Sequence, residues 1–318
     1  MVMANWTLER FAEAALHNFL LIVSFLSQFC ICTSSTIPRH LNFHNMSTGT
    51  PLKNTLLSFP TASTLLITIN RPSSLNCLDT FTHNELDRVF RWFDAEPGLR
   101  CAILTGVGRS FCAGADLKEW DSNNSLSTSA SSQARSLPAS GFGGLSRRGG
   151  KKPIICAVNG ICFGGGCEMI INADIVIAEA HAVFALPEVK IGVVALAGAL
   201  TRLVRTVGKQ RAMEMALTGR TLGAEEAMEW GLVNRVVGAG KCVEEAIKMA
   251  ELIAANSPDS VIVSREGIKM GWEGVGAEEG TRLIEQNWYS RMDKGPNMKE
   301  GVRSFVEKRK PNWVPSKL

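Results

Sequence analysis

The chain has 318 residues, of which 45% are hydrophobic and 20% are charged, so it can form one large α/β domain or two smaller ones around a buried core. Its 34 basic and 30 acidic residues give a net charge of +4, which suits an anionic small ligand but is too small an excess to indicate a nucleic-acid-binding protein. The single Tyr also leaves few aromatic platforms for stacking bases, so no nucleic-acid partner is expected.

The nine cysteines are scattered along the chain and form no CxxC pair. Most lie inside apolar runs, such as the one around Cys156, and we expect buried or half-buried free thiols in a reducing compartment. A zinc site would need clustered Cys and His ligands, and the chain has only five His. We therefore expect neither a catalytic metal nor a bound cofactor.

The N-terminal part carries a short apolar run at residues 19–32. It is too short for a membrane span, which needs about 20 apolar residues. Its length fits the apolar region of a secretory signal, but the preceding stretch carries Glu9 and Glu13 where such a signal has a basic start. No membrane span is expected here.

The C-terminal tripeptide Ser316, Lys317 and Leu318 has the form of a peroxisomal targeting signal, which an import receptor reads. The alternative is a basic tail without a role. Because a secreted protein has no use for this tripeptide, we expect a peroxisomal protein. We also expect residues 1–45 to lie outside the folded enzyme, as a mistaken start or a disordered leader, with Met46 beginning the polar N-terminus.

From residue 56 onward the pattern becomes regular. The sequence predicts a β-branched strand over 63–70, a helix over 80–94 and a buried strand over 100–106. This order is typical of a βαβ unit with a largely parallel sheet. A Ser- and Gly-rich stretch at 121–150 then predicts a flexible loop with a function, or disorder.

Beyond that stretch, strands are predicted over 152–160 and 173–178, with a helix opening at Gly164 between them. The rest of the chain is predicted to be mostly helical. We expect a core domain over 46–255 and a helical C-terminal region over 256–318. The helices predicted after the strand at 173–178 are 210–217, 224–230, 242–255, 257–272 and 278–292.

Three segments combine glycines with carboxylates: SFCAGADLK at 110–118, NGICFGGGCE at 159–168 and FALPEVKIG at 184–192. A GGG run at a helix start is often simple turn chemistry, but bare glycines also let a substrate oxygen approach free N–H groups. Such donors stabilise an oxyanion. Glu168 fits either a catalytic group or a charge that favours a helix start, and Glu188 fits either a catalytic group or a solvated loop residue.

Together these segments resemble the enoyl-CoA hydratase/isomerase, or crotonase, superfamily, in collinear order from about residue 55 to 313. The resemblance implies an α/β fold, a crotonase-like spiral of ββα units with a helical C-terminal trimerisation region, and a homotrimer or hexamer. The matching stretches are INRPSSLNCL (69–78), AILTGVGRSFCAGADLKEW (102–120), KKPIICAVNGICFGGGCEMIINADIVIA (151–178), FALPEVKIG (184–192), RAMEMALTGRTLGAEEAMEWGLVNRVV (211–237) and EGVRSFVEKRKPNW (300–313).

The resemblance also implies an acyl-CoA substrate, of which coenzyme A is a part. In this family two backbone N–H groups hold the thioester oxygen, and they match Ala115 and Gly165. Lys118 also fits a solvated loop cation. The residues implied to line the CoA side are Ala113, Asp116, Leu117 and Lys118.

Both acid–base positions of the family are glutamates here, Glu168 and Glu188. The resemblance implies that they hold one water, one carboxylate accepting its proton as it attacks C3 and the other delivering a proton to C2. Which glutamate does which stays open. An isomerase of the same family, which relies on one carboxylate, is the nearest alternative. A non-catalytic RNA-binding relative is a distant one, because both glutamates are present.

The stretch after Glu188 departs from the family pattern. Leu196 and Leu200 stand where small or polar residues are usual, which predicts an altered acyl pocket. The VVALAG run and the SGFGGLSRR segment resemble fungal peroxisomal members of secondary metabolism. These include mevalonyl-CoA hydratases of siderophore pathways and hydratases of toxin pathways. The acyl group itself stays open.

Overall fold

The computed structural model describes residues 51–126 and 137–318, and all of them fall within one compact unit, Pro38–Leu318. The predicted extension over 1–45 and the middle of the predicted loop lie outside the described residues. The predicted boundary at residue 256 separates two helices inside this unit. In the described part of the chain, no helix is both long and apolar enough to cross a membrane.

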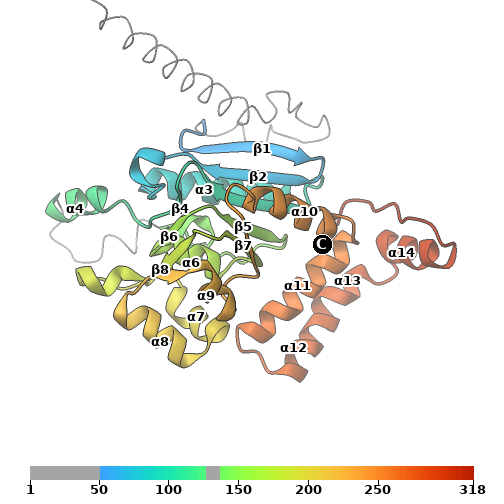
Figure 1. The fold of residues 1–318 in the computed structure, drawn as a ribbon. Coiled ribbons are helices and arrows are strands. Elements are labelled where there is room, and N and C mark those ends of the chain that lie inside the picture. Colours follow the sequence, from blue (N-terminus) through green and yellow to red (C-terminus); the bar gives the residue numbers. More distant parts are fainter. Residues whose placement is uncertain (1–50, 127–136) are drawn as a thin grey trace, which may run out of the picture. The chain divides into compact units, whose positions relative to one another are not determined.

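A six-stranded sheet in the order β1-β2-β3-β5-β7-β10 forms the largest layer (Figure 1). Only β1 pairs antiparallel, with β2, and the other neighbours are parallel, which confirms the predicted sheet type. The sequence predicted the strands β2, β3, β5 and β7, but it missed β1 and β10 at the two edges of the sheet. The bounds are β1 Thr55–Thr61, β2 Thr64–Ile69, β3 Cys101–Gly106, β5 Ile154–Val158, β7 Ile175–Glu179 and β10 Arg235–Val237.

A second sheet of four short strands has the order β4-β6-β8-β9. Its first three strands each follow directly on a strand of the large sheet, β4 after β3, β6 after β5 and β8 after β7. The chain therefore winds as a repeated pair of strands, and the turns after β4 and β6 come out side by side. The bounds are β4 Ser110–Cys112, β6 Ile161–Phe163, β8 Val183–Ala185 and β9 Leu222–Gly223.

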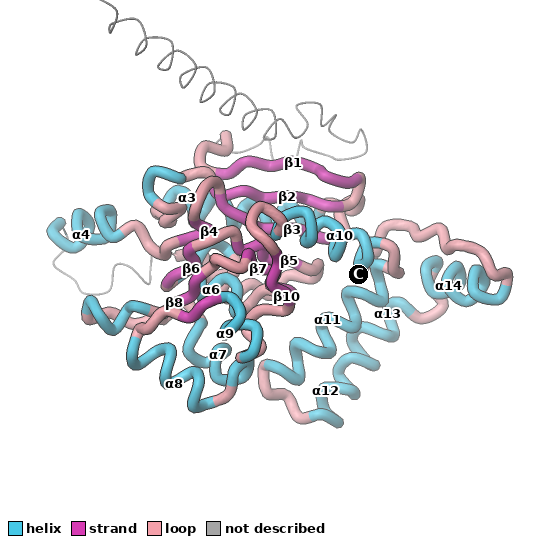
Figure 2. Tube along the Cα trace, in the orientation of Figure 1, coloured by secondary structure: helices cyan, strands magenta, loops and turns pink. Residues whose placement is uncertain are grey.

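The two faces of the large sheet bury alternate residues of each strand, as the period of two requires. On β3, Cys101 and Ile103 belong to a cluster that includes Ala246 of α10 (Cys242–Ala254). Leu104 of the same strand faces the main core, which includes Phe90 of α3 (Thr80–Ala95). Figure 2 shows α10 running across the strands of this sheet, and α10 contacts β3, β5 and β7. Apolar contacts thus cover both faces of the large sheet, from which the strands of the site follow.

The predicted flexible loop over 121–150 is wrong for its described end. Residues 137–150 pack closely and include η2, Phe142–Gly144, whose residues are buried. Gly144 adopts a φ of +65°, and a Cβ there would lie 2.5 Å from the Cα of Asp87 on α3. The glycines that suggested flexibility therefore allow close approach to a helix. At the other end, α4 (Leu117–Leu126) follows the AGAD turn.

The C-terminal part is mostly helical, as predicted, although β9 and β10 were not foreseen. The predicted helix over 278–292 contains a five-residue π-helical turn, Glu285–Tyr289. The helices α7 and α14 were missed. The bounds not yet given are η1 Pro72–Ser74, α6 Gly165–Ile171, η3 Pro187–Ile191, α7 Ala199–Val207, α8 Lys209–Thr218, α9 Ala224–Glu229, α11 Pro258–Trp272, α12 Ala277–Ile284, α13 Ser290–Met292 and α14 Pro296–Val306.

Candidate active site

The GGG run forms the sharp turn from β6 into α6. Gly164 has a φ of +53°, and α6 begins at Gly165. A Cβ on Gly166 would lie 2.3 Å from the carbonyl oxygen of Cys112, so only glycine fits there. This turn places Glu168 in the first turn of the helix, where its residue is only 4% exposed. The GGG run therefore serves as a tight turn and at the same time leaves Glu168 in a position suited to catalysis.

The start of a second helix, α7, also contacts Glu168. The backbone N–H of Ala199, the first residue of α7, donates to Oε2 of Glu168 at 3.0 Å. Gly198 precedes it with a φ of +126°, which glycine adopts most readily. Because first-turn N–H groups of a helix have no partner inside the helix, α7 supplies one of them to this carboxylate.

The environment raises the pKa of Glu168 to about 7. Burial is the largest cause, and the negative charge of Glu188 acts in the same direction. The Ala199 N–H, the Ala197 backbone and the positive charge of Arg147 oppose the rise. A carboxyl group that titrates near neutral pH can donate or accept a proton under ordinary conditions.

Glu188 lies on η3 with its carboxylate directed towards the GGG turn. A Cβ on Gly164 would be only 3.1 Å from Oε1 of Glu188. Oε2 is buried and has no hydrogen-bond partner within the described parts of the chain. Burial raises the pKa of this carboxyl group as well, against the effect of its own backbone N–H. A half-buried carboxylate with an unpaired oxygen differs from the solvated loop residue that the sequence alone also allowed.

Two unpaired backbone N–H groups converge next to these carboxylates. Leu78 donates to the Gly114 oxygen at 2.9 Å and accepts from the Asp116 N–H at 3.0 Å, so this short bridge skips Ala115. A Cβ on Gly114 would lie 3.6 Å from the nitrogen of Gly165, which brings the two turns together. Within residues 51–126 and 137–318, neither the Ala115 N–H nor the Gly165 N–H donates a hydrogen bond. Two free donors beside two carboxyl groups suit the stabilisation of an oxyanion during proton transfer.

Comparison with known proteins agrees with this arrangement. Residues 60–316 match the family described as enoyl-CoA hydratase/isomerase. The chain belongs to the enoyl-CoA hydratase/isomerase family. The match and the collinear motifs cover the same part of the sequence, so the resemblance inferred from the residues is confirmed.

Similar curated proteins include the mevalonyl-coenzyme A hydratases of Beauveria bassiana, 52% identical, and of Aspergillus fumigatus, 51% identical. Each alignment covers 83% of this chain and 96% of the relative. The mitochondrial enoyl-CoA hydratase of Pongo abelii is 41% identical over 78% of this chain and 82% of its own. The fold matches the crystal structure of enoyl-CoA hydratase from Mycobacterium tuberculosis, with a TM-score of 0.74, 34% identity and coverage of 83% of this chain and 99% of that one. The predicted crotonase-like fold is thereby confirmed.

The residues predicted to line the CoA side of this family member fall into two groups. Asp116 forms an ion pair with Arg71 at 2.8 Å, and Arg71 also contacts Asp79 at 3.1 Å. Burial would raise the pKa of Asp116, but the hydrogen bond and charge of Arg71 lower it overall. Asp116 therefore helps to hold the AGAD turn in place.

The other members of that predicted set differ in exposure. The N–H of Ala113 donates to the Leu75 oxygen at 3.1 Å, and Ala113 is half-buried. Leu117 and Lys118 are exposed at the start of α4, where a large ligand can reach them. Their binding of CoA stays a prediction.

Leu196 and Leu200, the departures from the family pattern, are 76% and 37% exposed in the single chain. Their expected effect on the acyl pocket stays a prediction. Sequence reasoning missed Phe142, whose ring lies against Gly165, since a Cβ there would be 2.3 Å from the ring. It also missed His83, which packs edge-on against Phe142. The only sequence signal was a large apolar residue set among glycines at 141–144.

The seven cysteines of the described residues are all free, and six of them are buried, as predicted. Burial raises the pKa of the Cys162 and Cys112 thiols, so they stay protonated. Among the described residues, no group of three or more His, Cys, Asp or Glu side chains is arranged to hold a metal ion.

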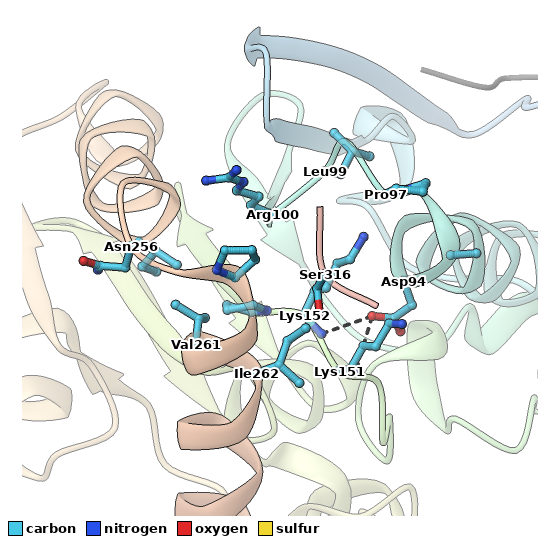
Figure 3. Close-up of a pocket in the computed structure, with 14 residues that line it drawn as sticks. Asp94, Pro97, Leu99, Arg100, Lys151, Lys152, Asn256, Val261, Ile262 and Ser316 are labelled. Carbon is cyan, nitrogen blue, oxygen red and sulfur yellow. Dashed lines mark hydrogen bonds between the residues drawn. The ribbon is translucent and has the colours of Figure 1, made fainter. Parts of the chain in front are cut away.

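A hollow of about 50 Å³ lies apart from this site and shares none of its residues (Figure 3). Its lining includes Asp94, Arg100, Lys151 and Ser316. Ser316 belongs to the C-terminal tail, and the Leu318 oxygen accepts a hydrogen bond from Lys151 Nζ. The hollow is therefore the place where the tail packs against the body of the protein.

Proposed function

We propose that this protein adds water to a 2,3-unsaturated acyl-CoA, or removes water from a 3-hydroxyacyl-CoA, as a carbon–oxygen lyase. The observation that carries the proposal is the pair of carboxyl groups at one turn. Glu168 has a pKa of about 7, and Glu188 has a buried, unpaired oxygen beside Gly164. Glutamates so placed can hold a water molecule and exchange protons with it near neutral pH.

The proposed reaction uses the two glutamates in opposite protonation states. The thioester oxygen accepts hydrogen bonds from the N–H groups of Ala115 and Gly165, which stabilise the negative charge that develops on it. The ionised carboxylate takes a proton from water while the water oxygen bonds to C3. The electrons of the C2–C3 double bond move towards the thioester, and the protonated carboxyl group then delivers a proton to C2. Dehydration is the same sequence in reverse.

The isomerase alternative shifts a double bond with one carboxyl group. Here Glu188 raises the pKa of Glu168, so the two carboxyl groups interact electrostatically. Two carboxyl groups at one turn suit a reaction in which one accepts a proton and the other donates one.

Mevalonyl-CoA is the substrate that we propose, in equilibrium with its dehydrated thioester. The support is 52% and 51% identity to two fungal proteins named mevalonyl-coenzyme A hydratase, with 96% of each relative covered. A mevalonyl group carries a hydroxyl and a methyl on C3 and a second hydroxyl at its far end. Loss of the C3 hydroxyl with a C2 proton is the reaction described above. With this substrate the protein would act in siderophore or other secondary metabolism, as the resemblance in sequence implies.

The direct test is the pair of variants Glu168→Gln and Glu188→Gln, assayed with mevalonyl-CoA and with a straight-chain trans-2-enoyl-CoA. Formation or loss of the conjugated thioester is followed by absorbance. Each variant is expected to lower kcat by about 10²- to 10⁴-fold, the usual contribution of a general acid or base. Glu251→Gln, an exposed position on α10, is the matched control. Full activity in either site variant would rule out the two-glutamate mechanism.

We also propose that Ser316, Lys317 and Leu318 direct the protein to the peroxisome through the import receptor. Since Ser316 is half-buried and Leu318 contacts Lys151, the tail must leave its hollow for a receptor to bind it. The test compares the location in fungal cells of the full chain and of a chain lacking these three residues. A cytosolic full-length protein would refute the proposal.

A homotrimer or hexamer is proposed for the assembly. The support is a set of apolar side chains that a single chain leaves open, among them Val302, Phe305 and Val306 of α14, which are 65%, 85% and 74% exposed. Such exposed apolar residues on one helix are typical of surfaces that are covered by another chain. Sedimentation analysis of the purified protein tests this, and a monomer at micromolar concentration would contradict it.

A further inference from the structure

His83 is a buried histidine for which the proposed reaction has no use. It lies in the first turn of α3 and is only 5% exposed. Its Nδ1 accepts a hydrogen bond from the Gly143 N–H at 2.9 Å. An imidazole nitrogen that accepts a hydrogen bond carries no proton, so in the neutral ring the proton sits on Nε2. Burial also lowers the pKa of His83 to about 4, against the charge of Asp79, and the ring therefore stays neutral.

The Nε2–H of His83 is a donor without a partner. No described residue accepts a hydrogen bond from it. A structural role is met by Nδ1, which pairs with Gly143, and by the ring, which packs on Phe142. Neither contact uses Nε2, and this nitrogen is not among the fully buried unpaired side-chain atoms of the described residues, so it borders space that a ligand atom can reach.

The position of the ring connects this donor to the site. The Phe142 ring lies against Gly165, whose N–H is one of the two proposed oxyanion donors. The His83 ring packs edge-on against the same Phe142 ring, with the two ring centroids 4.5 Å apart and the ring planes at 80°. A Cβ on the neighbouring Gly143 would meet Met169 and Leu78, so apolar side chains surround Gly143. His83 is thus a polar side chain on the Phe142 ring, and that ring lies against Gly165, whose N–H is proposed to hold the thioester oxygen.

We propose that His83 is a specificity-determining residue whose Nε2–H donates a hydrogen bond to a hydroxyl group at the far end of the acyl chain. The site then favours acyl-CoA thioesters with a terminal hydroxyl over those that end in hydrocarbon. This proposal rests on the proposed function, since it names the part of the substrate that the same site recognises. His83 takes no part in proton transfer at C2 or C3.

The test compares two substrates in one enzyme preparation, mevalonyl-CoA and 3-hydroxy-3-methylpentanoyl-CoA, which differ only in the terminal hydroxyl. The measured quantity is the ratio of their kcat/KM values in dehydration. Because both substrates meet the same enzyme, the ratio does not change with the folded fraction. The variants are His83→Leu, which removes the donor, and His83→Gln, whose amide offers both an acceptor for Gly143 and a donor. If His83→Leu does not fold, His83→Met carries the same comparison.

The wild-type protein is expected to favour mevalonyl-CoA by about tenfold, the upper range for one neutral hydrogen bond. In His83→Leu or His83→Met the ratio should fall close to one, and His83→Gln should keep part of the preference. A wild-type ratio near one, or an unchanged ratio in the variants without a donor, overturns the role of His83 while hydration itself stands. Absence of water addition or removal with every CoA thioester instead refutes the proposed function, and the inference with it.

Discussion

The N–H of Ala199 donates to Oε2 of Glu168 across 3.0 Å, and so the first residue of α7 fixes a carboxyl group on the first turn of α6. The donor favours the ionised form of Glu168, whereas burial disfavours it. Their balance leaves the pKa at about 7. This backbone N–H thus helps to orient the carboxyl group and limits the rise of its pKa.

Ala199→Pro removes this donor at the first position of a helix, where the backbone tolerates proline, although the ring must also be accommodated at a buried position. Without the N–H, the pKa of Glu168 should rise further. We expect kcat to fall by about tenfold, the effect of losing one hydrogen bond to a charged group. The activity that depends on ionised Glu168 should move to higher pH. A pH–rate profile measures both.

The matched control for that variant is Ala224→Pro, at the first position of α9. It is equally buried and also follows a glycine, Gly223. It should leave the pH–rate profile where the wild-type protein has it. A profile that does not move in Ala199→Pro would show that this N–H does not tune Glu168.

The raised pKa of Glu168 predicts a pH-dependent gain in stability for Glu168→Gln. The folded protein holds this proton up to about pH 7, whereas the unfolded chain releases it near 4.5. The wild-type protein therefore loses stability relative to the variant as pH rises from 4.5 to about 7. The difference in the free energy of unfolding should grow by up to about 3 kcal/mol across that window, since one pKa unit corresponds to about 1.4 kcal/mol.

Urea unfolding at pH 5 and pH 8 measures this difference. The exposed control Glu251→Gln should show no such growth. A Glu168→Gln variant whose relative stability is the same at both pH values would contradict the burial that is assigned to this carboxyl group.

Gly165→Ala should displace the Phe142 ring, because the added Cβ would lie 2.3 Å from it. We expect a loss of about 1–3 kcal/mol in the free energy of unfolding, typical of an overpacked core, and a lower kcat. The loss should largely disappear when Phe142→Ala is already present, and a double-mutant cycle measures this coupling.

Gly166→Ala provides the contrast, because its Cβ would meet the Cys112 carbonyl oxygen in the backbone. Truncating Phe142 cannot relieve that contact. Additive effects of Gly165→Ala and Phe142→Ala would show that the ring does not rest on Gly165.

Lys118→Ala tests the predicted CoA contact at the start of α4. Lys118 is exposed, and an exposed ion pair contributes at most about 1 kcal/mol, which corresponds to about a fivefold change in affinity. We expect KM for CoA thioesters to rise by about twofold to fivefold with kcat unchanged, and the increase to shrink at high salt. An equal increase at low and high salt would argue against a contact with phosphate.

Local patterns in the sequence carried much of the fold. The apolar runs at 63–70 and 100–106 became neighbouring parallel strands, and the helix predicted over 80–94 is α3, Thr80–Ala95. Short strands escaped notice because three residues, as in β4 and β8, show no periodicity. The stretch at 137–150 was wrongly predicted to be flexible. Glycine occurs both in flexible loops and where a backbone packs closely against another element, and the sequence alone does not separate these two cases.

By itself the sequence determined the family, the two glutamates and the GGG turn, because these depend on residue types at fixed spacing along one chain. Only the tertiary structure decided what surrounds them. Ala199 lies 31 positions from Glu168 and His83 lies 60 positions from Gly143, yet each pair shares a hydrogen bond. Burial, the direction of a free N–H and the resulting pKa come from such distant contacts, and no local spacing encodes them.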